Sequence, residues 1–192
     1  MKVAIIDYGA GNIQSIRFAL ERLGATPVLS HDADEIQNAS HVIFPGVGEA
    51  SSAMKKLRAT GLDKLIPSLT QPVLGICLGM QLMCNHTEEG NTKGLRVFNT
   101  QVVRFNTDLN VPHMGWNTVA GKGALFTSIP QNSHFYMVHS YYAKPSAEMI
   151  GSCTYGIPFG AALAKDNFYG TQFHPEKSGA IGATVLQNFL AL

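Results

Sequence analysis

The chain has 192 residues, which is enough for one domain with a substantial hydrophobic core. Only 14% of the residues are charged and 45% are apolar, a composition that excludes an intrinsically disordered chain. The formal net charge is +1 and no dense run of Lys and Arg occurs, so bulk attraction to nucleic acid or to an acidic membrane is excluded as well.

The first half of the chain alternates β-prone runs with helical patterns. Strands are predicted over residues 3–6, 26–29, 41–44 and 72–76, and helices over residues 13–23, 50–57 and 78–84. Gly24 is predicted to end the first helix, and Pro45-Gly46 to end the third strand. Strands that alternate with helices predict a parallel sheet covered on both faces.

After about Lys93 the pattern changes to short β-prone runs separated by Gly, Asn and Pro. Antiparallel strands and hairpins are predicted over residues 100–105, 134–143, 148–155, 160–165 and 168–175. The segment 113–117, HMGWN, is predicted to be a Gly-rich turn, and a final helix is predicted over 180–190. The expected fold class is therefore α/β, as one domain over residues 1–192 in which a mostly parallel sheet flanked by helices carries an added antiparallel β region in its C-terminal half.

The three cysteines are Cys77, Cys84 and Cys153, an odd number that excludes a complete disulfide framework within one chain. Their spacing does not match a metal site, and a reducing cytoplasm is the expected location. The apolar run before Asp7 is too short for a signal peptide, and no apolar stretch approaches the roughly 20 residues of a membrane span. We therefore expect a cytoplasmic protein without a metal site.

Cys77 stands in the segment GICLGMQ, between a predicted strand and a predicted helix. This is the arrangement of a nucleophile elbow, in which Gly75 and Gly79 would allow a tight turn and close backbone packing. A helix N-terminus would favour a thiolate, and the amide of Leu78 would point towards an oxyanion. The alternative is that Cys77 is a small buried apolar residue. Cys84, inside the run MQLMC, is predicted to lie in the core.

The segment TQFHPEKS offers a base for such a nucleophile. Pro175 favours an extended conformation at His174, so the side chains of His174 and Glu176 are expected to project to the same side. The carboxylate could then accept a hydrogen bond from one ring nitrogen while the other nitrogen faces the thiol. Cys77, His174 and Glu176 would form a catalytic triad. Alone, His-Pro-Glu also fits a loop histidine beside a surface glutamate.

GICLGMQ and GTQFHPE together resemble the class I, or triad, glutamine amidotransferases, whose fold is flavodoxin-like. The whole series of motifs resembles the family of glutaminase subunits of imidazole glycerol phosphate synthases, and reads, in chain order, IIDYGAGNIQSI, FPGVG, GICLGMQ, VPHMGWN, VHSYY and GTQFHPEKSG. The likeness runs from Ile5 to near the C-terminus.

This resemblance implies that the chain hydrolyses L-glutamine to glutamate and ammonia. Cys77 would attack the side-chain carboxamide, His174 would act as general base and acid, and Glu176 would orient His174. A glutamyl thioester would form and be hydrolysed, without any cofactor. The resemblance further assigns an oxyanion hole to Gly46, Val47 and Leu78, and glutamine binding to Gly48, Gln81, Ser140 and Tyr141. By itself, the PGVG segment is also consistent with an ordinary turn.

The resemblance also implies a partner, because such a subunit passes its ammonia to a (β/α)8-barrel synthase subunit in a heterodimer. There the ammonia would enter the synthesis of imidazole glycerol phosphate, for histidine, and of an aminoimidazole carboxamide ribotide. The implied partner contacts are Asn12, Trp116, Asn117, Tyr136 and Lys177. Trp116 is the only tryptophan, a residue type that is common both in cores and at interface hot spots.

Three segments depart from the usual pattern of the family. Glu49-Ala50 follows PGVG, CNHTEEG occupies residues 84–90, and GLRVFNTQVVRF occupies residues 94–105. None of them contains a predicted triad residue.

Four other interpretations are compatible with parts of the sequence. One is a triad glutaminase serving anthranilate, guanylate or pyridoxal phosphate synthesis, against which DYGAGN and PHMGWN argue. Another is a cysteine hydrolase or redox protein of a different elbow-bearing family, which the His-Pro-Glu segment disfavours. A nucleotide-binding module is disfavoured because Gln14 replaces the third glycine of GxGxxG. A scaffold that lacks chemistry is disfavoured by the intact triad.

Overall fold

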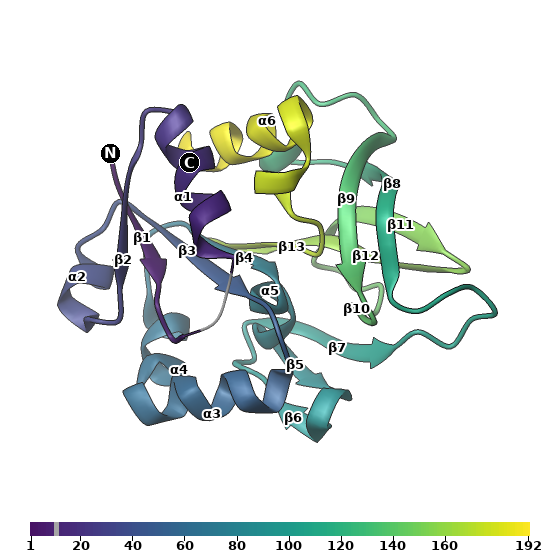
Figure 1. Ribbon diagram of the computed structural model, residues 1–192, viewed down its shortest axis with the longest axis horizontal. Helices are drawn as coiled ribbons and strands as arrows, with labels where there is room; N and C mark the ends of the chain where they lie inside the picture. The colour runs from purple at the N-terminus through teal and green to yellow at the C-terminus, as the bar shows by residue number, and fades with distance from the viewer. Residues whose placement is uncertain (10–11) are drawn as a thin grey trace.

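The computed structural model describes residues 1–9 and 12–192. The loop predicted after the first strand includes Ala10 and Gly11, so that part of the prediction lies outside the described residues. The thirteen strands of the described residues form one hydrogen-bonded sheet, with helices packed against it (Figure 1). None of the helices in these residues is both long and apolar enough to cross a bilayer.

Five parallel strands form one side of the sheet, in the order β2-β1-β3-β4-β13. They are β1 (Lys2–Ile6), β2 (Thr26–Ser30), β3 (His41–Gly46), β4 (Val73–Cys77) and β13 (Phe168–Thr171). The predicted α/β class with a parallel sheet is confirmed.

Helices cover both faces of this parallel block. In the view of Figure 1, α1 and α6 lie above the sheet, and α3 and α4 lie below it. The helices are α1 (Ile13–Arg22), α2 (Ala33–Gln37), α3 (Ala50–Thr60), α4 (Leu62–Leu65), α5 (Leu78–Leu82) and α6 (Gly179–Leu190). The short 3-10 turns are η1 (Ile66–Ser68), η2 (Glu89–Asn91), η3 (Ala124–Phe126) and η4 (Pro175–Lys177).

The run of apolar residues in β1 follows from this two-sided cover. Val3 and Ile5 pack into the core beneath α1 and α6, while Ala4 and Ile6 pack into the core beneath α3. Successive side chains of a strand point to opposite faces, so a strand buried on both faces is apolar throughout rather than alternating.

The remaining strands extend the sheet in a mostly antiparallel manner. From β13 the sheet continues through β12, β10, β7, β5 and β6, while β11 joins β12 to β8, which pairs with β9. These strands are β5 (Cys84–Thr87), β6 (Thr92–Lys93), β7 (Phe98–Arg104), β8 (His113–Gly121), β9 (Ser133–His139), β10 (Tyr141–Ala143), β11 (Met149–Tyr155) and β12 (Ile157–Lys165). The antiparallel region predicted for the C-terminal half is confirmed.

Three local predictions are wrong. The helix predicted over 78–84 ends at Leu82, because Cys84 pairs with Phe98 of the later strand β7. The turn predicted over 113–117 is part of β8, which pairs residue by residue with β9. Strand β3 does not stop at Pro45-Gly46, since Gly46 still lies opposite Cys77 in the ladder. In each case, pairing with a distant strand outweighs the local signal.

The topology brings three strand ends to one edge of the sheet. Gly46, at the end of β3, lies opposite Cys77, at the end of β4. Thr171, at the end of β13, lies opposite Ile76, so the chain that follows β13 runs past Cys77. The carboxyl edge of an open parallel sheet is where such folds place their binding sites.

Candidate active site

Cys77 occupies a sharp turn between β4 and α5. Its backbone has φ 55° and ψ −112°, a conformation that non-glycine residues seldom adopt and that costs about 1–3 kcal/mol. The next residue, Leu78, begins α5. This strained junction has the backbone geometry of the predicted nucleophile elbow.

The two flanking glycines are required by close backbone contacts. A Cβ atom on Gly79 would collide with the carbonyl oxygen of Phe44 in β3, and one on Gly75 would lie 2.8 Å from the backbone nitrogen of Met80. Both are contacts with backbone, which cannot move aside as a flexible side chain can. The predicted role of Gly75 and Gly79 in close packing is confirmed.

His174 and Glu176 form the predicted contact. His174 is extended, with φ −99° and ψ 95°, and its Nδ1 lies 2.8 Å from Oε1 of Glu176. Both side chains are buried, with 5% and 0% of their surface exposed. Among the described residues, neither Nε2 of His174 nor Oε2 of Glu176 has a hydrogen-bond partner. The Nε2 atom is therefore available for a thiol or a substrate.

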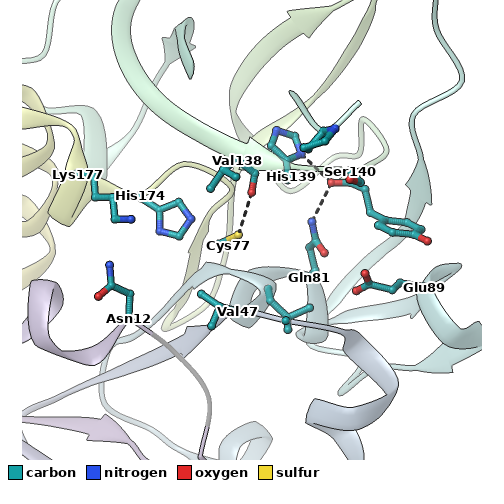
Figure 2. A pocket seen from close by; sticks show the side chains of 14 residues that line it. Asn12, Val47, Cys77, Gln81, Glu89, Val138, His139, Ser140, His174 and Lys177 are labelled. Carbon is teal, nitrogen blue, oxygen red and sulfur yellow. Dashed lines mark hydrogen bonds between the residues drawn. The ribbon is translucent and has the colours of Figure 1, made fainter. Parts of the chain in front are cut away.

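The environment of His174 favours its protonated form. Burial opposes the charge, but the neighbouring Cys77 thiol and Glu176 carboxylate outweigh burial and raise the pKa of His174 to about 10. Figure 2 shows the His174 ring beside the Cys77 sulfur. A protonated imidazole next to a sulfur nucleophile can hold a proton ready for a leaving group.

A cavity of about 370 Å³ opens over Cys77. Its lining includes these residues predicted for the oxyanion hole or for glutamine binding: Val47, Gly48, Leu78, Gln81, Ser140 and Tyr141. Gly46 does not line the cavity but lies buried against α5, where an added Cβ would come within 2.7 Å of the Leu78 Cβ. The cavity thus contains all but one of these predicted residues.

Gln81 is buried and its amide nitrogen is fully engaged. Nε2 donates to the carbonyl oxygen of Tyr141 at 2.9 Å and to Oε1 of Gln172 at 2.7 Å. An amide nitrogen has two hydrogens, so the remaining group of Gln81 is its oxygen, an acceptor. That oxygen suits a positively charged substrate group.

Glu89 is a cavity residue that the sequence did not single out. It lies beyond Gln81 from Cys77 (Figure 2), within the segment 84–90 that departs from the family pattern. Burial raises the pKa of Glu89, a hydrogen bond from the backbone amide of Ala50 lowers it, and the nearby Glu49 carboxylate raises it further. A half-buried carboxylate of this kind would gain from a cationic partner.

Two further histidines contact each other at this site: His139 lines the cavity, and His113 lies against His139. Nδ1 of His139 donates to the carbonyl oxygen of Tyr141 at 2.7 Å, so Nε2 of His139 accepts a hydrogen bond from Nδ1 of His113 at 3.0 Å. Nε2 of His113 in turn accepts from the Asn117 amide at 3.2 Å. Burial lowers the pKa of His113 to about 4 and, against the hydrogen bond to Tyr141, that of His139 to about 3.

These neutral histidines predict a pH dependence of stability. Below about pH 6.5 the unfolded chain would protonate both, while the folded chain keeps them neutral until about pH 4. The unfolded state then binds more protons, so the free energy of unfolding should fall from pH 6.5 to pH 5, by up to about 1.4 kcal/mol per pH unit for each histidine. Urea unfolding across this range measures the slope; a flat profile would contradict the prediction. His31→Gln, on an exposed loop, should leave the slope unchanged.

Four of the five predicted partner contacts lie at the surface or in the cavity lining, and the fifth, Asn117, is hydrogen-bonded within the chain. Trp116 is 57% exposed, and its ring meets that of Tyr136 edge-on at 6.2 Å. The Lys177 ammonium lies 5.8 Å from the Tyr136 ring centre, and both Lys177 and Asn12 line the cavity. Asn117 differs, because its amide also donates to the carbonyl of Thr154 at 3.0 Å and is therefore engaged within the chain.

Comparisons with known proteins give one consistent result. A family model described as glutamine amidotransferase class I matches residues 4–192. The chain is 52% identical to a Bacteroides thetaiotaomicron protein described as imidazole glycerol phosphate synthase subunit HisH, with 100% of both chains covered. It is 47% identical to the Haemophilus influenzae protein of the same description, with 99% of this chain and 97% of that one covered.

Solved structures agree on the fold. A crystal structure described as a glutamine amidotransferase matches with a TM-score of 0.78 at 17% identity, and 98% of this chain and 97% of that one are covered. A Thermotoga maritima structure described as PurLQS matches with a TM-score of 0.72 at 15% identity, and 99% of this chain and 97% of that one are covered. At these identities the likeness is one of fold.

Proposed function

Because the chain belongs to the class I glutamine amidotransferase family, we propose that it is the glutaminase subunit of an imidazole glycerol phosphate synthase. Its similarity to subunits of that name, at 47–52% identity over nearly the whole chain, supports this assignment over a glutaminase of another pathway. The proposal treats residues 1–192 as one amidotransferase domain.

The observation that carries the proposal is the meeting of Cys77, His174 and Glu176 at one end of a cavity that has acceptors at its other end. The nucleophile, the imidazole and the carboxylate come from two strand ends that are far apart in sequence. Gln81 and Glu89 lie in the direction away from His174 (Figure 2). Glutamine has an amide at one end and an α-ammonium group at the other, which matches this distribution.

The reaction follows from these positions. The Cys77 sulfur attacks the side-chain carbonyl carbon of glutamine, and His174 gives its proton to the departing nitrogen, which leaves as ammonia. A glutamyl thioester remains. Water then attacks the thioester carbon, His174 accepts the proton of that water, and the carbon–sulfur bond breaks to release glutamate. Glu176 holds the imidazole through Nδ1 during both steps.

The negative charge that develops on the carbonyl oxygen requires nearby donors. We assign this role to the Leu78 amide and to the peptide between Gly46 and Val47. Gly48 has φ +94°, a conformation that favours glycine, and so lets the PGVG segment turn at the mouth of the cavity. The Leu78 amide is the first of α5 and follows the nucleophile directly.

The two α-groups of glutamine would bind at the far end of the cavity. Its α-ammonium is placed against Oε1 of Gln81 and the carboxylate of Glu89. Its α-carboxylate is placed against Ser140 and Tyr141, at the break between β9 and β10, with Gly48 alongside.

Glu89→Gln tests this placement. We expect KM for glutamine to rise about tenfold or more with kcat within about twofold, because the variant keeps an acceptor for the Ala50 amide but loses the charge that pairs with the ammonium group. Steady-state glutamate release measures both constants. The matched control is Glu88→Gln, one residue earlier and exposed, which should leave KM unchanged. An unchanged KM in Glu89→Gln would contradict the placement.

The proposal extends to a (β/α)8-barrel synthase partner that consumes the ammonia and makes imidazole glycerol phosphate and an aminoimidazole carboxamide ribotide. The proposed docking residues are Trp116, Tyr136, Lys177 and Asn12. Lys177 and Asn12 line the cavity, and the Tyr136 ring contacts both Trp116 and Lys177. Asn117 is proposed to act there through its position in β8.

The test is glutamate release from glutamine by the purified chain, alone and with a cognate barrel synthase plus its nucleotide ligand. We expect weak hydrolysis alone and at least about tenfold stimulation in the liganded complex. Hydrolysis that ignores the partner would reassign the acceptor pathway. An absence of hydrolysis under every condition would overturn the glutaminase assignment.

A further inference from the structure

Gln172 lies directly behind the nucleophile. It follows the last residue of β13, and its backbone nitrogen donates to the carbonyl of Ala161 in β12 at 2.8 Å. The residue is fully buried, and its amide nitrogen lies 3.7 Å from the Cys77 sulfur. The sulfur therefore has a ring nitrogen and an amide from the same segment as neighbours.

The orientation of the Gln172 amide is imposed by its surroundings. The carbonyl oxygen of Tyr141 can only accept, so the Gln81 group facing it must be the NH2 group. That same nitrogen lies 2.7 Å from Gln172, which must therefore present its oxygen. The nitrogen of Gln172 is then the atom that faces the sulfur.

The Tyr141 carbonyl, which determines how the Gln81 and Gln172 amides are oriented, is itself held in place. It also accepts from Nδ1 of His139 at 2.7 Å, and His139 is fixed by His113 behind it. His113 stacks on the Tyr155 ring with centroids 4.0 Å apart. A directed set of hydrogen bonds thus reaches from β8 to the nucleophile, and each member has one arrangement of donors and acceptors.

The contacts of the Cys77 sulfur with the Val138 carbonyl oxygen and with the Gln172 N–H change in opposite directions when the sulfur becomes negatively charged. A Cys77 thiol can donate to the Val138 carbonyl oxygen, 3.9 Å away. Once the proton has moved to His174, that oxygen faces a negative sulfur and the contact is lost. The N–H of Gln172 gains instead, since hydrogen bonds to an ionised acceptor are the stronger ones.

We propose that Gln172 is a further catalytic residue, whose amide N–H donates to the Cys77 sulfur and stabilises the thiolate, with Gln81 holding that N–H in place. The proposal rests on the proposed glutaminase function. The same N–H acts twice in the cycle. It stabilises the thiolate before attack, and again when the carbon–sulfur bond of the thioester breaks and its electron pair returns to sulfur.

The pH dependence of alkylation by iodoacetamide tests this role without any glutamine. Cys77 lines the cavity, whereas Cys84 and Cys153 are buried in the core, so the reagent reports on Cys77. In Gln172→Met, which keeps the volume but removes the donor, the midpoint of the alkylation profile should rise by roughly one pH unit. Gln172→Glu, which keeps the acceptor for Gln81 but turns an oxygen towards the sulfur, should shift it further.

A second variant keeps the test decisive if Gln172→Met does not fold. Gln81→Met leaves Gln172 in place but removes the donor that orients it, and should give a smaller shift in the same direction. Gln131→Met, at an exposed position outside the cavity lining, is the control and should match the wild type. Folded Gln172 or Gln81 variants with the wild-type profile would overturn the proposal. A wild-type chain that releases no glutamate would overturn the proposed function instead, so the two failures are distinguishable.

Discussion

Replacing Cys77 by alanine is expected to lower kcat for glutamate release by at least about a thousandfold. The variant keeps the fold of the elbow but removes the atom that attacks the carboxamide, and no thioester can form. Cys77→Ser should fall by a similar factor, because a hydroxyl is far less readily ionised beside His174. The measurement is steady-state glutamate release in the complex with the barrel partner, where the wild-type rate is highest.

Cys153→Ala is the matched control for this loss. Its thiol is buried in the core, where burial raises the pKa of Cys153 to about 12, and it does not line the cavity. We expect this variant to lose some stability and to keep its kcat. If both Cys77→Ala and Cys153→Ala retained near-native hydrolysis, Cys77 would be a packing residue and the triad assignment would be wrong.

Gly79→Ala is expected to destabilise the chain by about 3 kcal/mol or more. Its new methyl group would overlap the Phe44 carbonyl oxygen and lie 3.3 Å from the Pro45 carbonyl carbon, so β3 and α5 would have to separate. Because the elbow depends on that packing, the little folded protein that forms should also lose glutaminase activity. Urea unfolding and glutamate release measure the two effects.

Gly160→Ala separates this collision from the general effect of losing a glycine. The nearest atom to a Cβ at Gly160 is the end of the Leu163 side chain at 3.3 Å, which can shift slightly. Its unfolding free energy should stay within about 1 kcal/mol of the wild type. An equal loss of unfolding free energy in the two variants would show that α5 and β3 can move apart to accept the methyl group at little cost.

The elbow and the His174–Glu176 contact could be predicted because their geometry is local. Strand, cysteine and glycines are consecutive in GICLG, and the two members of His-Pro-Glu are two residues apart in an extended segment. The parallel sheet followed from alternating strand and helix patterns. In these places the chain neighbours are also the neighbours in space.

Glu89, Gln172 and the His113–His139 pair could not be predicted, because their partners are distant in sequence. Gln172 meets Gln81 across 91 positions and Cys77 across 95, and no local pattern encodes such a meeting. The mistaken turn over 113–117 has the same cause, since β8 is defined by its pairing with β9. One signal was available, because Gln172 is only two positions before His174 in the sequence.

The burial of the His174–Glu176 pair also determines how the site responds to ionic strength. In the part of the chain that the structure describes, the pairs Lys2–Glu35 and Arg17–Glu21 have roughly half of each side chain in solvent, where counterions weaken them. Dissolved ions cannot come between His174 and Glu176. Concentrated salt would therefore weaken the ion pairs of the surface. The orientation of the His174 imidazole would stay as it is in dilute buffer.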